Sequence, residues 1–387
     1  MQLIDEILPD TNKVYRKIEE YYDPEEVLMF DIETTGLSAS SSFIYLIGIN
    51  LKKDGSWHII QLFNDDGMSE PEIIRYFMDI LKDYKYLVEF NGDTFDIPFV
   101  KKRLEYINRK QGTDIIDHFD DITRIDLYKL IRPFKKPLGL ANLKQKTIER
   151  FLGLNRIDQM NGGELINVYF QYLTYKNRNY RSLVLQHNRD DMEGMFYLTD
   201  IFALSKLSLG CLHFSDMKIT SGTSLKLRLF FIPDTFPDMS FAATAGAKEM
   251  SIKKSEASSP LMVISGNAGE AYISLPVTTG IFRYYHKDPK NYHYYPELDL
   301  AYHKDLAASL SEYERIPANK SNCYTKVEGY FIKKYGFEGG KTFYPDESKN
   351  PSKNDAYIEL SDEFLSDREL IDQFTRHMVR IMLSGKL

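Results

Sequence analysis

The chain of 387 residues contains only two cysteines, Cys211 and Cys323. Two cysteines cannot build the disulfide framework of a small secreted domain, although a single bridge between them stays open. A reduced pair of thiols is the simpler expectation, and it is typical of a cytoplasmic protein.

Long apolar runs are also lacking. The longest, residues 43–51, is far shorter than the roughly 20 residues that a membrane helix needs. The N-terminal segment MQLIDEILPD places acidic residues inside its one apolar patch, which is not the pattern of a signal peptide. We therefore expect neither a membrane segment nor export.

The chain has no excess of basic residues, since 49 Lys and Arg stand against 56 Asp and Glu and give a net charge of −7. This balance argues against a protein that coats nucleic acid, so any such contact must use local basic patches. Hydrophobic residues make up 43%, which is enough for folded cores. A chain of this length usually forms two domains.

Regular apolar patterns fill the first part of the chain. Three apolar runs predict strands, with Asp54-Gly55 as a hairpin turn before the third. A helical pattern opens at Pro71, and a short buried strand precedes a second helix. The predicted elements are strands at Val27–Ile32, Phe43–Leu51, Trp57–Phe63 and Tyr86–Phe90, and helices at 71–81 and Phe95–Arg109. This order predicts an α/β fold with a mixed sheet, three antiparallel strands coming before the parallel ones.

The character of the sequence changes near residue 206. Residues 127–205 are helical in several pieces, the last running from Arg181 to about Leu204, whereas β-branched and aromatic runs dominate afterwards. We expect one domain at 1–205 and a C-terminal α+β domain of unknown function at 206–387. Residues 283–304 mix aromatic and basic side chains. They predict either a stacking platform for single strands or packed tyrosines beside a loop.

Two carboxylates end the first predicted strand. Asp31 and Glu33 are two residues apart in MFDIETTGL, and side chains alternate across a strand, so both point to one face. Neighbouring carboxylates repel each other, a cost that a divalent cation between them removes. A solvated strand end is the alternative explanation for this pair.

Further acids occur at two later positions. The segment from Asn91 to Asp96 opens a predicted helix, where Asp93 and Asp96 could also be ordinary caps. In the long late helix, His187 and Asp191 are four residues apart and share a face that is otherwise apolar. A buried histidine with an acid one turn away indicates a functional pair, although a satisfied core histidine is the alternative.

The segments FDIETTGL, EFNGDTFDIPFV and HNRDD, in this order, resemble the three exonuclease motifs of the DEDD superfamily of 3′–5′ exonucleases. The chain is most similar to the YprB-like, RNase H-like bacterial branch, to which LANLKQKTIERFLGLNR also corresponds. The resemblance covers roughly residues 25–204. It implies an RNase H-like fold and a nuclease that hydrolyses phosphodiester bonds with two divalent ions, Mg²⁺ or Mn²⁺.

By this resemblance, Asp31, Glu33, Asp96 and Asp191 are the metal-binding carboxylates, and His187 is the general base. Histidine titrates near neutral pH and suits that role. The spacing departs from the family pattern, because histidine-type enzymes place the base five residues before the last Asp. The four-residue spacing found here normally accompanies tyrosine.

Asp190 is a rival for the fourth carboxylate. We expect Asp191 to take this place, because it follows the family register and shares the face of His187.

The resemblance also implies substrate contacts. The loop that follows Glu33 would hold the terminal nucleotide with its backbone, and its Leu would pack against the last base. Basic residues on the second helix and between 132 and 156 could guide single-stranded 3′ ends, or could simply be solvated. The expected substrate-binding residues are Thr34, Thr35, Gly36, Leu37, Asn91, Lys101 and Lys144. Protein partners are not predicted.

Two other functions stay open. The domain could be a nucleic-acid-binding module with weak or no catalysis, or an RNase H-type endonuclease that cuts internally. The complete set of four carboxylates favours an enzyme, and a D-x-E pair with a late His-x-x-x-Asp favours the exonuclease.

Overall fold

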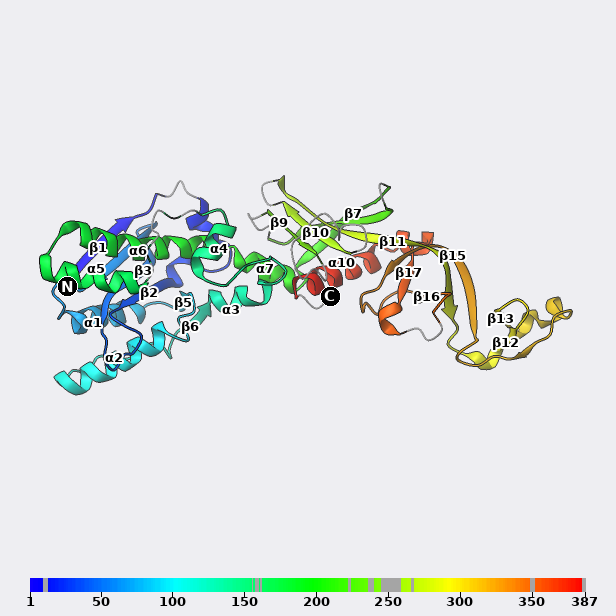
Figure 1. Ribbon diagram of the computed structural model, residues 1–387, viewed down its shortest axis with the longest axis horizontal. Coiled ribbons are helices and arrows are strands. Elements are labelled where there is room, and N and C mark those ends of the chain that lie inside the picture. Colours follow the sequence, from blue (N-terminus) through cyan, green and yellow to red (C-terminus); the bar gives the residue numbers. More distant parts are fainter. Residues whose placement is uncertain are drawn as a thin grey trace. The chain divides into compact units, whose positions relative to one another are not determined.

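The computed structural model describes residues 1–9, 13–154, 156, 160, 162–221, 224–235, 240–244, 259–265, 268–348 and 352–384 (Figure 1). Contacts within the chain divide it into two compact units. One comprises Met1–Lys136 and Leu140–Ser205, and the other Pro137–Gly139 and Lys206–Leu387. Among the described residues, no helix combines the length and apolar character needed to cross a membrane.

The first unit is built on a six-stranded mixed sheet with the order β1-β4-β3-β2-β5-β6. The strands β1, β4, β3 and β2 pair antiparallel, whereas β2, β5 and β6 run parallel. The bounds are β1 Gln2–Ile7, β2 Val27–Thr34, β3 Ile44–Lys53, β4 Ser56–Phe63, β5 Tyr86–Glu89 and β6 Thr123–Asp126. This arrangement confirms the predicted RNase H-like fold, with β1 added at one edge.

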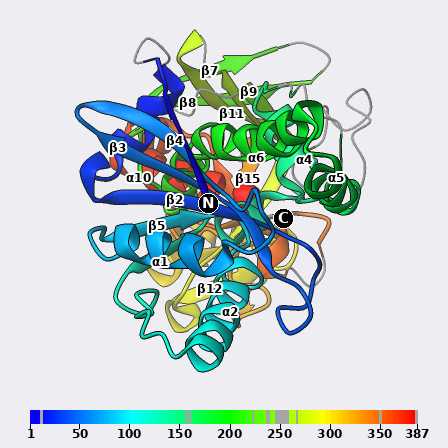
Figure 2. The same ribbon diagram turned by 90° about the vertical axis from the view of Figure 1, so that its left-hand side faces the viewer.

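Helices cover both faces of this sheet (Figure 2). Buried side chains of β2, such as Phe30, pack with α1 and α2 on one face. On the other face, Tyr45 and Phe63 pack against α5 and α6. The helical bounds are η1 Lys13–Glu20, η2 Pro24–Glu26, α1 Glu70–Leu81, α2 Asp96–Gln111, α3 Leu127–Ile131, η3 Arg132–Phe134, α4 Gln145–Phe151, α5 Gly162–Tyr175, α6 Arg178–Leu198 and α7 Ile201–Ser208.

Local sequence patterns predicted most of these helices and strands. The hairpin between β3 and β4 turns at Asp54 and Gly55, which both adopt positive φ, 51° and 81°. The expected helix from Arg181 to about Leu204 is wrong in one respect, because it is two helices. The chain leaves the helix at Thr199, whose hydroxyl donates to the carbonyl of Phe196. The next residue, Asp200, pairs with Lys17 at 2.5 Å.

The second unit contains strands followed by two helices, as the predicted α+β class requires. The long strand β11, Glu270–Tyr285, pairs with β8, β10, β15 and β16, and a separate small sheet has the order β13-β12-β14. The other bounds are β7 Leu212–Thr220, β8 Lys226–Pro233, β9 Ser240–Thr244, β10 Leu261–Ser265, η5 Pro289–Asn291, β12 Tyr292–Tyr295, β13 Leu300–His303, η6 Lys304–Leu310, β14 Ile316–Pro317, β15 Tyr324–Lys333, β16 Phe343–Pro345, η7 Lys353–Asp355, β17 Tyr357–Glu359, α9 Asp362–Ser366 and α10 Arg368–Leu383.

The aromatic and basic segment of the second unit, residues 283–304, is paired with itself and with side chains of β15. The guanidinium of Arg283 lies 4.3 Å from the centre of the Tyr324 ring. Asp299 accepts hydrogen bonds from the hydroxyls of Tyr294 and Tyr324 and pairs with Lys326 at 2.6 Å. These contacts match packed tyrosines more closely than a free stacking platform. Both cysteines of the chain are free thiols.

Candidate active site

Asp31 and Glu33 lie near the end of β2, on the side of the sheet that α6 covers. The residues between and before them, Ile32 and Phe30, belong to the core on the opposite side, as strand alternation requires. The pairing of β2 with β3 shifts register between Glu33 and Thr34. Thr34 still pairs with Ile44, and the strand ends there, one residue after the second acid.

Neighbouring elements hold both acids by hydrogen bonds. The amide of Asn188, on α6, donates to Oδ2 of Asp31 at 3.2 Å. The hydroxyl of Tyr45, on β3, donates to Oε2 of Glu33 at 3.4 Å. The Tyr45 ring is itself fixed, because it is fully buried and stacks on Tyr169 with ring centres 4.3 Å apart.

A glycine lets α6 approach the sheet beside Asp31. Gly48 on β3 is the register partner of Asp31. A Cβ at this position would collide with the Asn188 side chain and would lie 2.7 Å from Cγ of Met192. The absence of a side chain therefore permits the close packing that brings α6 to the acids.

Asp96, His187 and Asp191 complete the group. Asp96 is the first residue of α2 and is buried, and its Oδ1 accepts the backbone N–H of Ile32 at 3.3 Å. On α6, Nε2 of His187 lies 3.3 Å from Oδ2 of Asp191 and 3.7 Å from Oε1 of Glu33. Three segments far apart in the sequence thus bring four acids and a histidine together.

The acids repel one another strongly. Burial, followed by the charges of Asp96 and Asp191, raises the pKa of Asp31 well above its ordinary value. Burial and the charges of Asp191 and Asp96 do the same to the pKa of Glu33, against the opposing hydrogen bond from Tyr45. Burial also raises the pKa of Asp96, to about 7, although backbone N–H groups stabilise its charged form.

The donor set fits a hard divalent cation. One ligand atom from each of Glu33, His187 and Asp191 can be chosen so that all three lie within 4.8 Å of one another. The charges of Asp96, Asp191 and Glu33 act on Asp31, and the charge of Asp191 acts on Asp96. Carboxylate oxygens are the ligands that Mg²⁺ and Mn²⁺ favour, and such an ion would relieve the repulsion that raises these pKa values.

Asp190 points elsewhere. Its side chain is buried and its Oδ1 accepts a hydrogen bond of 2.5 Å from the amide of Gln186. Asp191 instead contacts His187, Arg156 and the amide of Gln145, the last through its backbone carbonyl. Of the two rivals for the fourth carboxylate, the structure brings Asp191 to the group.

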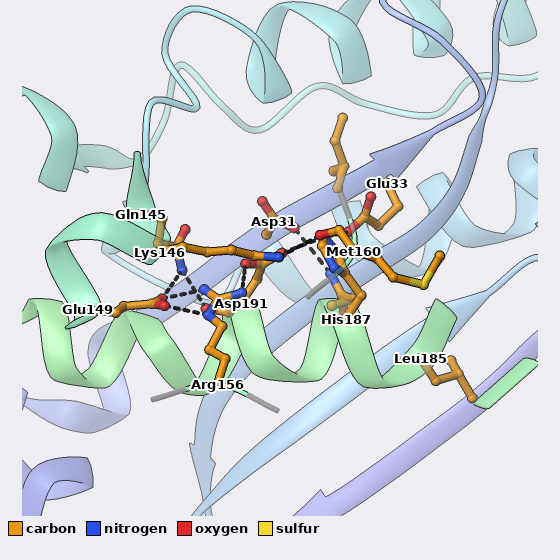
Figure 3. A network of polar contacts seen from close by, with 12 residues as sticks. Asp31, Glu33, Gln145, Lys146, Glu149, Arg156, Met160, Leu185, His187 and Asp191 are labelled. Atoms are coloured by element: carbon orange, nitrogen blue, oxygen red, sulfur yellow. Dashed lines mark hydrogen bonds and ion pairs between the residues drawn. The ribbon is translucent and has the colours of Figure 1, made fainter. Parts of the chain in front are cut away.

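Two residues whose roles the sequence did not reveal, Arg156 and Gln145, hold Asp191, and a third, Glu149, holds Arg156 (Figure 3). Arg156, which the sequence places in a basic stretch, has a side chain only 5% exposed and bonds both Asp191 and Glu149. Glu149 and Gln145 both lie on α4. The sequence left two alternatives for the basic residues between 132 and 156, a path for the substrate or a solvated surface. Neither describes Arg156, because its guanidinium is paired with Asp191 and Glu149.

The expected substrate-binding residues fall into two sets. Thr34, Thr35, Gly36 and Leu37 directly follow the acids of β2, and Leu37 is 89% exposed. The backbone of Gly36 lies close to the side chain of Ser42, because a Cβ at position 36 would lie 2.6 Å from Oγ of Ser42.

The other set lies on later segments. Asn91 has a positive φ of 64° and its backbone N–H donates to Asp126. Lys144 is exposed and directly precedes α4. Lys101 pairs with Asp117 and Asp120 at 3.1 and 2.8 Å, so it is not one of the groups gathered at the acids.

A second acidic group lies at the ends of the next two parallel strands. Glu89 and Asp126 are register partners on β5 and β6, and Asp93 joins them. Burial and the charge of Asp126 raise the pKa of Glu89 to about 8. Lys129 and Arg124 pair with Asp93 at 2.5 and 3.1 Å. A proton on Glu89 would therefore leave this group nearly neutral.

Comparison with known protein families finds one match for this unit. The model of the RNase_H superfamily matches residues 28–203, a segment that contains β3 to β6, nearly all of β2, α6 and all five residues of the site, but not β1. The match supports the RNase H-like fold that the strand order shows.

Individual relatives are distant. A protein named DNA polymerase 1 from Sulfurisphaera ohwakuensis is 26% identical over an alignment of 229 residues, and the alignment covers 50% of this chain but only 26% of that protein. The family B DNA polymerase of Pyrobaculum calidifontis aligns with 93% of this chain and 46% of its own, at 12% identity and a TM-score of 0.40. Exonuclease I of E. coli, in a zinc-bound complex with single-stranded DNA, aligns with 53% of this chain and 54% of its own, at 11% identity and a TM-score of 0.25. At these TM-scores the two structures add nothing to the fold assignment.

Proposed function

We propose that residues 1–205 form a metal-dependent 3′–5′ exonuclease of the DEDD type, in the YprB-like branch. The observation that carries this proposal is the convergence of Asp31, Glu33, Asp96 and Asp191 with His187 on an RNase H-like sheet. The match to the RNase_H superfamily and the partial match to a DNA polymerase support a nuclease. Two free thiols agree with a place in the cytoplasm.

The four carboxylates would hold two divalent ions, Mg²⁺ or Mn²⁺. Bound ions of this kind lower the pKa of water and stabilise negative charge on a reacting phosphate. The charges of Asp96, Asp191 and Glu33 act on Asp31, so Asp31 would help to hold the ions together with these acids. Asn188 and Tyr45 would keep Asp31 and Glu33 oriented while ions bind and leave.

His187 would accept the proton of the attacking water at Nε2. This atom faces carboxylate oxygens of both Asp191 and Glu33, and these negative charges would stabilise the imidazolium after it takes the proton. The side chain of His187 is only 8% exposed, and those of Glu33 and Asp191 are 12% and 15% exposed. Partial exclusion of water strengthens such interactions.

The loop after Glu33 would receive the 3′ end of the strand. Leu37 exposes its apolar side chain and could pack against the last base, while the backbone of Thr34 to Gly36 would contact the terminal nucleotide. Asn91 and Lys144 lie on segments adjacent to site residues and could contact the backbone of the substrate, with Lys101 available only by giving up its acidic partners.

Purified protein incubated with end-labelled single strands tests the proposal. We expect a ladder of products shortened from the 3′ end in Mg²⁺ or Mn²⁺, no reaction in EDTA, and no reaction on strands with a blocked 3′ end. Parallel DNA and RNA strands identify the preferred substrate. Internal cuts would support an RNase H-type endonuclease instead, and retardation without cleavage would support a binding module.

A further inference from the structure

The guanidinium of Arg156 joins the fourth acid of the candidate active site to a second buried acid. Its Nη1 donates to Oδ1 of Asp191, and its Nε and Nη2 donate to the two oxygens of Glu149. The side chains of Arg156 and Glu149 are only 5% and 1% exposed. A planar guanidinium that binds one carboxylate at two points holds its third donor in a defined direction.

The packing of α4 against α6 is adapted to this ion pair. The amide of Gln145 donates to Oε1 of Glu149 at 2.9 Å and to the backbone carbonyl of Asp191 at 2.8 Å. Gly194 lies one turn after Asp191 on α6, and a Cβ there would collide with the Glu149 carboxylate. The absence of a side chain at Gly194 thus leaves room for Glu149 beside α6.

The ion pair between Arg156 and Asp191 determines which carboxylate oxygen of Asp191 faces the rest of the site. Oδ1 is engaged by Arg156, and Oδ2 is the atom that lies 3.3 Å from His187. An aspartate without such a partner can rotate about its terminal torsion. Repulsion by the neighbouring carboxylates would then turn the Asp191 carboxylate away from the site. The positive charge of Arg156 also opposes the repulsion that raises the pKa of Asp31.

We infer that Arg156, held by Glu149, is a positioning residue that presents Oδ2 of Asp191 to a divalent ion. The inference rests on the proposed function for the identity of the ion, and it deepens that function by adding residues from α4 and the segment after it. Groups that orient a metal ligand in this way typically change metal affinity by about 10- to 100-fold when removed.

Binding of Mn²⁺ without nucleic acid tests the inference, because the EPR signal of free Mn²⁺ falls as the ion binds. We expect Arg156→Met to weaken this binding by about 10- to 100-fold. The control Arg150→Met removes an exposed arginine from α4 and should bind as the wild type does. Asp191→Asn gives the reference for loss of the ligand itself.

Arg156→Met alone leaves the buried Glu149 without its cation and could unfold the protein. The double variant Arg156→Met with Glu149→Gln replaces both charges and should recover most of the thermal stability. If Arg156 positions Asp191, the double variant stays weak in Mn²⁺ binding although it is folded. If the ion pair merely supports the fold, Mn²⁺ affinity returns together with stability, and the inference is overturned.

The outcome is separable from the fate of the proposed exonuclease. Wild-type protein that binds Mn²⁺ through Asp191 but cleaves no oligonucleotide would refute the nuclease and leave the positioning role standing. Wild-type protein without Asp191-dependent Mn²⁺ binding would overturn the positioning role.

Discussion

Nε2 of His187 lies 3.3 Å from Oδ2 of Asp191, one turn further along α6. The four-residue spacing, which normally accompanies tyrosine in the exonucleases that these motifs resemble, therefore still brings an imidazole to the acids. The same nitrogen lies 3.7 Å from Glu33 on β2. Two carboxylates on different elements thus flank one ring, and this relationship underlies the first prediction.

We expect His187→Ala to slow hydrolysis by about 10² to 10⁴, the usual contribution of general-base assistance. His187→Tyr should keep more activity than the alanine variant, because tyrosine is the residue that normally occupies this spacing. Single-turnover rates at saturating Mn²⁺ measure both. Wild-type rates in both variants would show that His187 is structural.

Asp31→Ala should abolish hydrolysis while the metal-free protein keeps or gains stability. Asp31 is buried among Asp96, Asp191 and Glu33 and raises their electrostatic cost, so its removal relieves repulsion. Product formation and thermal unfolding in EDTA are the measurements. The matched control Asp79→Ala removes an exposed acid from α1 and should change neither. Full activity of Asp31→Ala would contradict the proposed site.

Asp190 and Asp191 offer a comparison of adjacent residues. Asp191→Asn removes one of the clustered charges and should reduce metal-dependent hydrolysis at least about 10²-fold. Asp190→Asn keeps an oxygen that can accept the hydrogen bond of Gln186 and should stay within a few-fold of the wild type. Rates measured on the same labelled strand decide between them, and the reverse order of activities would assign the fourth acid to Asp190.

The metal-free protein should lose stability as the pH rises from about 4 to 7. The pKa of Asp96 is raised to about 7 in the folded state, against about 3.9 for an unfolded aspartate. Between these two pKa values the folded state keeps a proton that the unfolded state releases. The contribution of this proton to the free energy of unfolding is lost as the pH rises to 7. Chemical denaturation in EDTA at several pH values measures this loss. Mn²⁺ should reverse it at pH 7, and no effect of Mn²⁺ there would argue against metal binding by these acids.

Glu89→Gln should remove part of the loss of stability that the metal-free protein shows as the pH rises. The pKa of Glu89 is raised to about 8, so its contribution to stability is complete below about 4.3 and is lost as the pH rises to 8, at up to about 1.4 kcal/mol per unit. Glutamine mimics the protonated acid beside Asp126 and does not titrate. Unfolding free energies at pH 5 and 8 test this, with the exposed Glu105→Gln as control. If Mg²⁺ raises the stability of the wild type at pH 8 but not that of Glu89→Gln, a cation takes the place of the proton on Glu89.

Periodic apolar patterns and short motifs determined much of this protein from the sequence alone. The alternation along β2 placed Asp31 and Glu33 on one face, and the spacing of His187 and Asp191 placed them on one face of α6. The turn at Asp54 and Gly55 followed from local backbone preferences. These features depend on residues close together in the chain, which is why they could be predicted.

Only the tertiary structure decided which distant residues complete the site. The edge strand β1 pairs with β4 across more than 50 residues, and its short segment, which contains the adjacent acids Asp5 and Glu6, carried no signal of its partner. Arg156 lies 35 residues from Asp191 and appears in the sequence as one of several basic residues. Its role depends on Glu149, Gln145 and the space left by Gly194. Such contacts arise from the packing of α4 on α6, where burial makes an ion pair necessary, and no local pattern encodes that packing.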